Sequence, residues 1–184
     1  MSPAVVGTYK DNSSPLRTLI RLSLFPRDMA MQWKRCGLTA DFVAGFFSYR
    51  YPRCRRSQNS LSTILNEMVE NAVKFSSPDD SPIEIALFDV DHEIVLQVDN
   101  WADQEQATRF LEQARALFDA VDIEACYIET IRRSAEDPGS SGIGLLTLIH
   151  DFQVALGVRL TPGGSATFSH ISIQVRLNPE EALA

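Results

Sequence analysis

Leu61 to Ser77 reads LSTILNEMVENAVKFSS, and this stretch decides how the rest of the chain is interpreted. Its apolar residues recur at helical spacing and predict a helix that packs one face on a core. These apolar positions are Ile64, Leu65, Met68, Ala72 and Phe75. Glu67, Asn71 and Lys74 fall within an arc of roughly 60° beside that face, at about 100° per residue.

The three polar residues suggest a chemistry. Magnesium prefers hard oxygen ligands and keeps several waters, so one Asn side chain together with nucleotide phosphates is a plausible set of ligands. Asn71 is therefore the candidate metal ligand, and Lys74 can neutralise phosphate charge. An ordinary amphipathic helix with a solvated polar flank explains the same spacing, so the pattern alone leaves both interpretations open.

Composition sets the broad class of the protein. The chain has 184 residues, of which 45% are hydrophobic and 22% charged, so we expect one globular domain. No apolar run reaches the roughly 20 residues that span a bilayer. A net charge of −7 argues against general nucleic-acid binding. The three cysteines show no metal or disulfide spacing, which favours a cytoplasmic location.

The order of expected elements predicts the fold. We expect a flexible tail over residues 1–14 and a single domain over 15–178, with a strand-helix-helix preface at 15–57 and a core at 58–177. Expected strands are 16–25, 83–87, 94–98, 158–160 and 166–177; expected helices are 27–36, 39–51, 61–75, 104–135 and 145–156. The aromatic residues Phe42, Phe46 and Phe47 are expected in the core. This order predicts an α/β (α+β) two-layer sandwich, a mixed sheet with helices on one face.

A glycine loop, SSGIGLL, opens directly into the helix expected from Leu145. Backbone N–H groups at such a helix start can point at an anion, and the helix dipole adds roughly half a positive charge there. We therefore take Ser141, Gly142, Ile143 and Gly144 as candidate phosphate contacts. Glycines also serve plain turns, so the loop gains specificity mainly from its position about 70 residues after Asn71.

Together these motifs resemble a known superfamily. NEMVENAVKF resembles the N-box of the GHKL (Bergerat-fold) ATPases and kinases, SSGIGLL resembles their G2 box, and GGSATFSHISIQV resembles their closing box. The resemblance covers about residues 58–177 and implies a Bergerat-type fold that binds ATP and Mg²⁺. By position, Asn71 matches the Mg²⁺-chelating residue, Glu67 the general base, and Lys74 a phosphate-side position.

The adenine side departs from the family pattern. The box Val-x-Asp-x-Gly reads Val98-Asp99-Asn100-Trp101-Ala102 here, so Asn100 replaces the Asp that binds the adenine amino group. Asn100 remains the candidate adenine contact, because its amide offers an acceptor and two donors. Ala102 replaces a glycine, Ala166 stands where a Thr is usual, and Ser140 replaces the first G2 glycine.

The rest of the chain indicates which group within the superfamily it resembles. His92, His150 and His170 all follow the N-box, so none matches the phospho-acceptor of a histidine kinase. The chain looks most like anti-sigma-factor serine kinases and SiaB-like bacterial protein kinases. That resemblance implies phosphorylation of Ser or Thr on a small regulatory protein of the anti-sigma-antagonist type, with a homodimer possible. The alternative is a non-catalytic, degenerate GHKL module that serves as a protein-binding scaffold.

Two segments are candidates for partner docking. Residues 135–141, in front of the glycine loop, have the composition of a short lid. Arg50, Arg53, Arg55 and Arg56 form a basic cluster that is either a solvated surface or a docking patch for an acidic partner.

Overall fold

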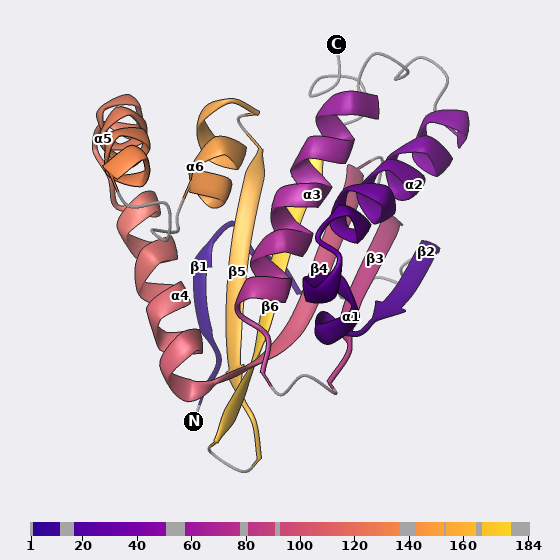
Figure 1. Cartoon of the computed structure of the whole chain (residues 1–184), viewed down its shortest axis with the longest axis horizontal. Coiled ribbons are helices and arrows are strands. Elements are labelled where there is room, and N and C mark those ends of the chain that lie inside the picture. Colours follow the sequence, from indigo (N-terminus) through magenta and orange to yellow (C-terminus); the bar gives the residue numbers. More distant parts are fainter. Residues whose placement is uncertain are drawn as a thin grey trace.

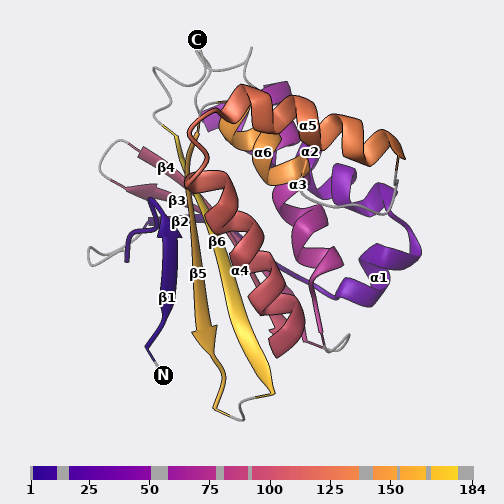
Figure 2. The ribbon, with the colours of Figure 1, turned by 90° about the vertical axis from the view of Figure 1, so that its left-hand side faces the viewer.

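The computed structural model describes residues 2–11, 17–50, 58–77, 81–90, 93–136, 143–152, 154–164 and 167–177. Within these residues, one sheet is covered on one face by helices (Figures 1 and 2). The strands are β1 (Ala4–Gly7), β2 (Arg17–Leu24), β3 (Ile83–Val90), β4 (Glu93–Asp103), β5 (Ala155–Pro162) and β6 (Phe168–Leu177). The helices are α1 (Pro26–Met31), α2 (Lys34–Arg50), α3 (Gln58–Lys74), α4 (Gln104–Phe118), α5 (Ile123–Glu136) and α6 (Ile143–His150).

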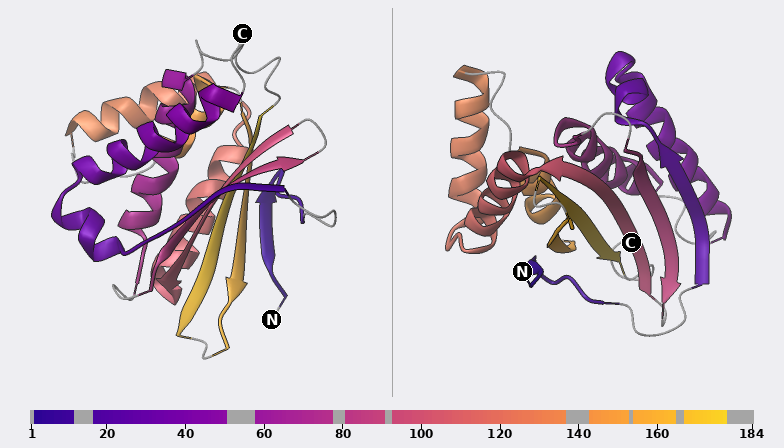
Figure 3. Two further views of the ribbon diagram at one scale, coloured as in Figure 1. Left: turned by 90° about the vertical axis from the view of Figure 1, so that its right-hand side faces the viewer. Right: turned by 90° about the horizontal axis from the view of Figure 1, so that it is seen from below.

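The sheet has the order β1-β5-β6-β4-β3-β2, and all of its pairings are antiparallel. The two-layer sandwich predicted from the sequence is confirmed (Figure 3). The expected mixed sheet is wrong. Strands β4 and β5, which flank the helical segment α4–α6, run in the same direction, but β6 inserts between them, so neither has a parallel neighbour.

The core lies between the sheet and the helices that cover it. Strand β6 alternates, with Ile171, Ile173 and Val175 in the main core cluster. Helix α3 runs along this core and buries its predicted apolar face; its buried residues are Leu61, Ile64, Leu65, Met68, Val69, Ala72 and Val73. Helix α2 packs beside α3 at the edge of the helical layer (Figure 1). The period of 3.6 in α3 and of 2 in the strands thus places the core as expected.

The N-terminal segment differs from the expected tail. Residues 4–7 form β1, which pairs with β5 in a register that sets Val6 against Val158. Thr8 continues the attachment, since its backbone N–H and its hydroxyl both donate to the Leu156 carbonyl oxygen, at 2.9 and 3.0 Å. A four-residue strand carries too little alternation to be recognised in a sequence, which is why the tail prediction was wrong here.

The preface also differs from its prediction. Gly37 lies inside α2 rather than at a helix end, and the break falls at residues 32–33. Thr39 is no N-cap, because its hydroxyl donates to the Arg35 carbonyl oxygen 2.8 Å away, one turn earlier in the same helix. Phe47 is buried as predicted, but Phe42 and Phe46 are 58% and 46% exposed, so their expected place in the core is wrong.

The long helix expected over residues 104–135 is divided. Asp103 caps α4 by accepting from the Gln106 backbone N–H at 2.8 Å. Asp122 accepts from the Ala125 N–H at 2.9 Å and so begins α5 as a separate helix. The last helix is shorter than expected, because α6 ends at His150 and β5 begins at Ala155.

We expect Gly7→Ala to destabilise the fold by about 2 kcal/mol. Gly7 has φ of 70°, and an added Cβ would lie 2.4 Å from the Leu156 carbonyl oxygen and 2.5 Å from the Phe118 ring. Left-handed backbone costs a non-glycine residue roughly 1–2 kcal/mol, and overpacking adds to this. Urea unfolding would measure the change. Gly164→Ala is the matched control, since its Cβ would meet nothing within 4 Å. Equal midpoints for the two variants would show that β1 contributes nothing to stability.

Candidate functional site

Helix α3 presents the predicted polar residues along one side. Glu67 and Asn71 are half-buried, one turn apart, and Lys74 follows in the last turn with an exposed side chain. Phe75 continues the apolar side and packs against Phe110, with ring centroids 5.0 Å apart and ring planes tilted by 58°. The structure therefore places the three polar side chains at the edge of the buried face, as their spacing predicted.

The start of α6 lies directly against two of these residues. A Cβ added to Gly144 would lie 2.5 Å from Glu67 Oε2 and 3.1 Å from Asn71 Nδ2. Any side chain at position 144 would displace the Glu67 carboxylate, so a glycine here lets the first turn of α6 lie directly against Glu67 and Asn71. Ile143, the first residue of α6, is half-buried; Ser141 and Gly142 fall outside the described residues. The fold thus brings together Glu67, Asn71 and Gly144, which are far apart in sequence.

Burial changes the electrostatics of this site. It raises the pKa of the Glu67 carboxyl above its ordinary value, and the nearby Glu70 carboxylate raises it further. Glu70 itself accepts a hydrogen bond from Asn66 Nδ2 at 2.8 Å. A raised pKa makes the Glu67 carboxylate a stronger base than an exposed one, which is a property of catalytic carboxyl groups and also of merely crowded ones.

The side-chain amide of Asn71 is the second notable feature of this site. Its Nδ2 atom is buried and has no hydrogen-bond partner among the described residues. Buried polar atoms are nearly always satisfied, so an unpartnered donor beside a glycine backbone fits a ligand that carries acceptor oxygens. Within the described part of the chain, no group of three His, Cys, Asp or Glu side chains could hold a metal ion. A metal here would depend on Asn71 Oδ1 and on oxygens of its own ligand, which is the ligand set expected from the sequence.

Asn100 has a different role in the geometry. It is only 2% exposed, and its Nδ2 donates to the carbonyl oxygens of Phe75 at 3.3 Å and Trp101 at 3.4 Å. Ser77 N–H also donates to the Trp101 carbonyl oxygen, at 2.8 Å. These bonds tie the end of β4 to the end of α3, about 12 Å along the helix from Glu67. Ala102 is fully buried nearby, and Ala166 lies outside the described residues.

A contact that the sequence did not reveal holds the other end of α6. The Tyr127 ring of α5 stacks on the His150 ring, with centroids 4.3 Å apart and planes 6° from parallel. Asp151 accepts from both residues, with His150 Nδ1 2.6 Å and the Tyr127 hydroxyl 3.3 Å from its carboxylate oxygens. The contact joins positions more than 20 residues apart, so no local sequence pattern indicates it. It links α5 to the helix whose first turn contacts Glu67.

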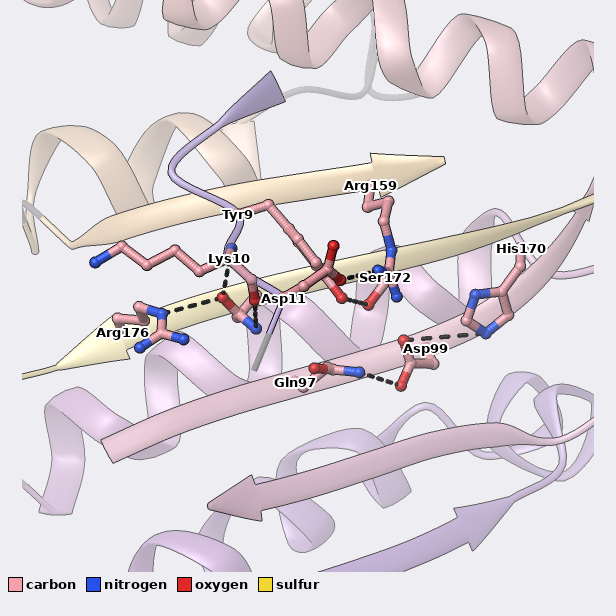
Figure 4. Close-up of polar contacts among 10 residues, drawn as sticks. Tyr9, Lys10, Asp11, Gln97, Asp99, Arg159, His170, Ser172 and Arg176 are labelled. Atoms are coloured by element: carbon pink, nitrogen blue, oxygen red, sulfur yellow. Dashed lines mark hydrogen bonds and ion pairs between the residues drawn. The ribbon is translucent and has the colours of Figure 1, made fainter. Parts of the chain in front are cut away.

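A second polar cluster lies on the sheet around β6, where the N-terminal segment crosses it (Figure 4). The backbone N–H of Lys10 donates to Gln174 Oε1 at 3.2 Å, and Gln174 Nε2 donates back to the Lys10 carbonyl oxygen at 3.3 Å. The Tyr9 hydroxyl lies 3.1 Å from Ser172 Oγ, and burial raises the pKa of Tyr9. Alternating Ser172, Gln174 and Arg176 in β6 were a sequence signal for this polar layer. It fastens the N-terminal segment and does not adjoin the Glu67 site.

No protein-family model matches the sequence, and no curated protein matches it. The fold is similar to that of a chain in the crystal structure of the SiaB–SiaC complex from Pseudomonas aeruginosa, with a TM-score of 0.63 and 14% identity. The match covers 88% of this chain and 91% of that chain, so the two share a fold over nearly their whole length. None of the described helices has the length and apolar character needed to cross a bilayer.

The raised pKa of Glu67 predicts how Glu67→Gln changes stability with pH. Between the ordinary value of 4.5 and the raised value, the folded state binds more protons than the unfolded state, so ionisation of Glu67 lowers stability as pH rises through this window. Glutamine removes this titration. We expect the variant to be more stable than the parent at neutral pH, and the difference to shrink as pH falls toward 4.

Urea unfolding at several pH values would measure this difference. Glu112→Gln, at an exposed position of α4, is the control and should show no such pH-dependent gain. Parallel pH curves for the parent and Glu67→Gln would mean that burial does not perturb Glu67.

Proposed function

We propose that this chain is an ATP- and Mg²⁺-dependent regulatory protein of the GHKL class that phosphorylates Ser or Thr on a small protein partner. The observation that carries the proposal is the approach of Gly144 to Glu67 and Asn71, next to the unpartnered Asn71 amide. It supports the proposal because Glu67 and Asn71, from the segment that resembles the N-box, lie beside Gly144, from the segment that resembles the G2 box.

Each residue has a role in this proposal. Asn71 Oδ1 would hold Mg²⁺, which when bound neutralises phosphate charge, and Asn71 Nδ2 would donate to a ligand oxygen. Lys74 and the backbone of the glycine loop, with Ser141, Gly142, Ile143 and Gly144, would add positive charge on the phosphate side. Glu67 would accept the proton of the acceptor hydroxyl or orient that hydroxyl. Positioning and electrostatics carry most of phosphoryl-transfer catalysis, so a site with few chemical groups is sufficient.

The partner is proposed from the structural neighbour as well as from the sequence. That neighbour was crystallised as a SiaB–SiaC complex. By analogy, a small regulatory protein of the anti-sigma-antagonist type is the proposed partner here, in the cytoplasm. Fold analogy alone does not assign function, so this step depends on the tests below.

The second candidate function is a non-catalytic module that binds protein and no longer uses nucleotide productively. It is favoured by Asn100, whose amide is bound to the Phe75 and Trp101 carbonyls, and by the fully buried Ala102. Both features make this side of the site less suited to binding the adenine ring of a nucleotide. The two functions make opposite predictions for nucleotide binding.

Calorimetry with ATP, with and without Mg²⁺, is the first test. We expect Mg²⁺-dependent affinity between micromolar and millimolar, about −4 to −8 kcal/mol, because Glu67, Asn71 and Lys74 match the family pattern whereas Asn100 and Ala102 depart from it. GTP should bind nearly as well for the same reason. Absence of binding at millimolar nucleotide would reject the kinase function and leave the scaffold.

Two variants separate metal binding from proton transfer. Asn71→Ala should remove the Mg²⁺-dependent part of the affinity. Glu67→Gln should keep the affinity and slow phosphoryl transfer by about 10²- to 10⁴-fold, the usual contribution of a general base. Transfer of phosphate from radiolabelled ATP to the partner protein would be followed, with Glu112→Gln as the control. Transfer by Glu67→Gln at the parental rate would show that Glu67 is structural.

A further inference from the structure

Helix α2 carries an apolar stripe on the side that faces away from the core. Leu38, Phe42, Phe46 and Tyr49 are 67%, 58%, 46% and 80% exposed. At about 100° and 1.5 Å per residue they lie within an arc of roughly 80° and extend over about 16 Å. The opposite side of the helix is buried, through Cys36, Ala40, Val43, Ala44 and Phe47. The α2 stripe, as we call these four exposed residues, is therefore additional to the face that folding requires.

The exposed apolar area of the stripe is large for a single helix. Large apolar side chains offer roughly 200 Å² each, so the four stripe residues together expose on the order of 500 Å². The largest apolar patch of a typical monomer measures about 300–600 Å² and is often functional, so the stripe is large enough to form the apolar centre of an interface. Met31 and Trp33, just before α2, are also exposed, by 75% and 47%.

Charge indicates the nature of the occupant. Residues 17–49, whose side chains the structure describes, contain five Lys and Arg residues and two Asp and Glu residues, a net charge of +3 in a chain whose net charge is −7. The stripe thus belongs to the basic part of an acidic protein. Lys34 and Arg35 begin α2, and both are exposed. An occupant with an apolar face and acidic flanks complements this surface.

Two other occupants fit less well. A second copy joined by a two-fold axis would set one basic segment against another. An anionic bilayer is a flat surface wider than the protein, so it would also face the acidic remainder of the chain. A single helix contacts only α2 and meets neither difficulty.

We propose that the α2 stripe docks an acidic amphipathic helix of the small protein partner. This inference rests on the proposed function for the existence of that partner. Helix α2 packs on α3, and Ser62 of α3 donates to the Asp41 carboxylate of α2, at 2.5 Å. Helix α6 lies on the other side of α3 (Figure 1). A helix docked on α2 therefore leaves the Glu67 and Gly144 site open for the acceptor residue.

The test uses a synthetic helix with a leucine stripe and glutamate flanks, and a matched helix with lysine flanks. Fluorescence anisotropy measures the binding of each to the full chain. Phe42→Glu/Phe46→Glu alters the stripe, and Ile128→Glu/Ile131→Glu on α5 is the control, since those residues are 61% and 45% exposed and the charge change is equal. Tyr49→Ser is a second, milder stripe variant at an 80% exposed position.

We expect micromolar binding of the glutamate helix, at least about tenfold weaker binding of the lysine helix, and weaker binding as salt rises. The stripe variant should lose at least about tenfold in affinity and the control less than about twofold. Circular dichroism checks that each variant is folded. If the double variant is not folded, Tyr49→Ser is used in its place and should lower the affinity for the glutamate helix a few fold.

Three results would overturn the proposal. The first is no binding of the glutamate helix, or equal loss in the stripe and control variants. The second is a dimer in sedimentation that the stripe variant alone dissociates, which would assign the stripe to a second copy. The third is stripe-dependent binding to phosphatidylglycerol vesicles without binding to the helix. Calorimetry with ATP on the stripe variant distinguishes this proposal from the proposed function. If the protein binds no ATP, the helix can still bind the stripe, and if the helix does not bind, ATP binding is still expected.

Discussion

The contact between the first turn of α6 and the side of α3 is the constraint on which the site depends. Gly144 brings backbone close to Glu67 and Asn71, and a larger residue there would displace the Glu67 carboxylate. Helix α6 has only eight residues, so its position is set by packing of Leu145, Leu146 and Leu148 in the core rather than by its own stability. The spacing of two helices, fixed by leucines, thus determines how a carboxylate, an amide and a glycine backbone face each other.

The sequence predicted those features that rest on a strong local period. Helix α3, its buried face and the alternating strands follow from side-chain spacing, and so does the two-layer class. The errors arose where a period is short or ambiguous. Strand β1 has four residues, and α2 carries apolar residues on two sides, so Phe42 and Phe46 could not be distinguished from Phe47 by pattern. The Tyr127–His150 stack and the exchange between Lys10 and Gln174 depend on tertiary structure, which no local pattern encodes.

Helix α3 lies between the Glu67 and Gly144 site and helix α2, which carries the exposed apolar stripe. One side of it carries Glu67 and Asn71 beside α6, and the other packs against α2, where Asp41 accepts from Ser62. A ligand on either surface that shifts α3 is energetically linked to the other surface, because both contacts share one rigid element. The side of α3 beside α6 and the side beside α2 therefore need no direct contact to influence each other.

The attachment of the N-terminal segment has a consequence for the order in which the protein is made. Residues 4–10 pair with β5 and β6. Lys10 can therefore form its hydrogen bond only after Gln174, 164 residues later in the chain, has been synthesised. At synthesis rates of about 5–20 residues per second, this delay is on the order of 10 s. During it, β1 has no strand to pair with and its unpaired backbone is available to other chains. Strand β1 can therefore join the edge of the sheet only after β5 and β6 have been synthesised.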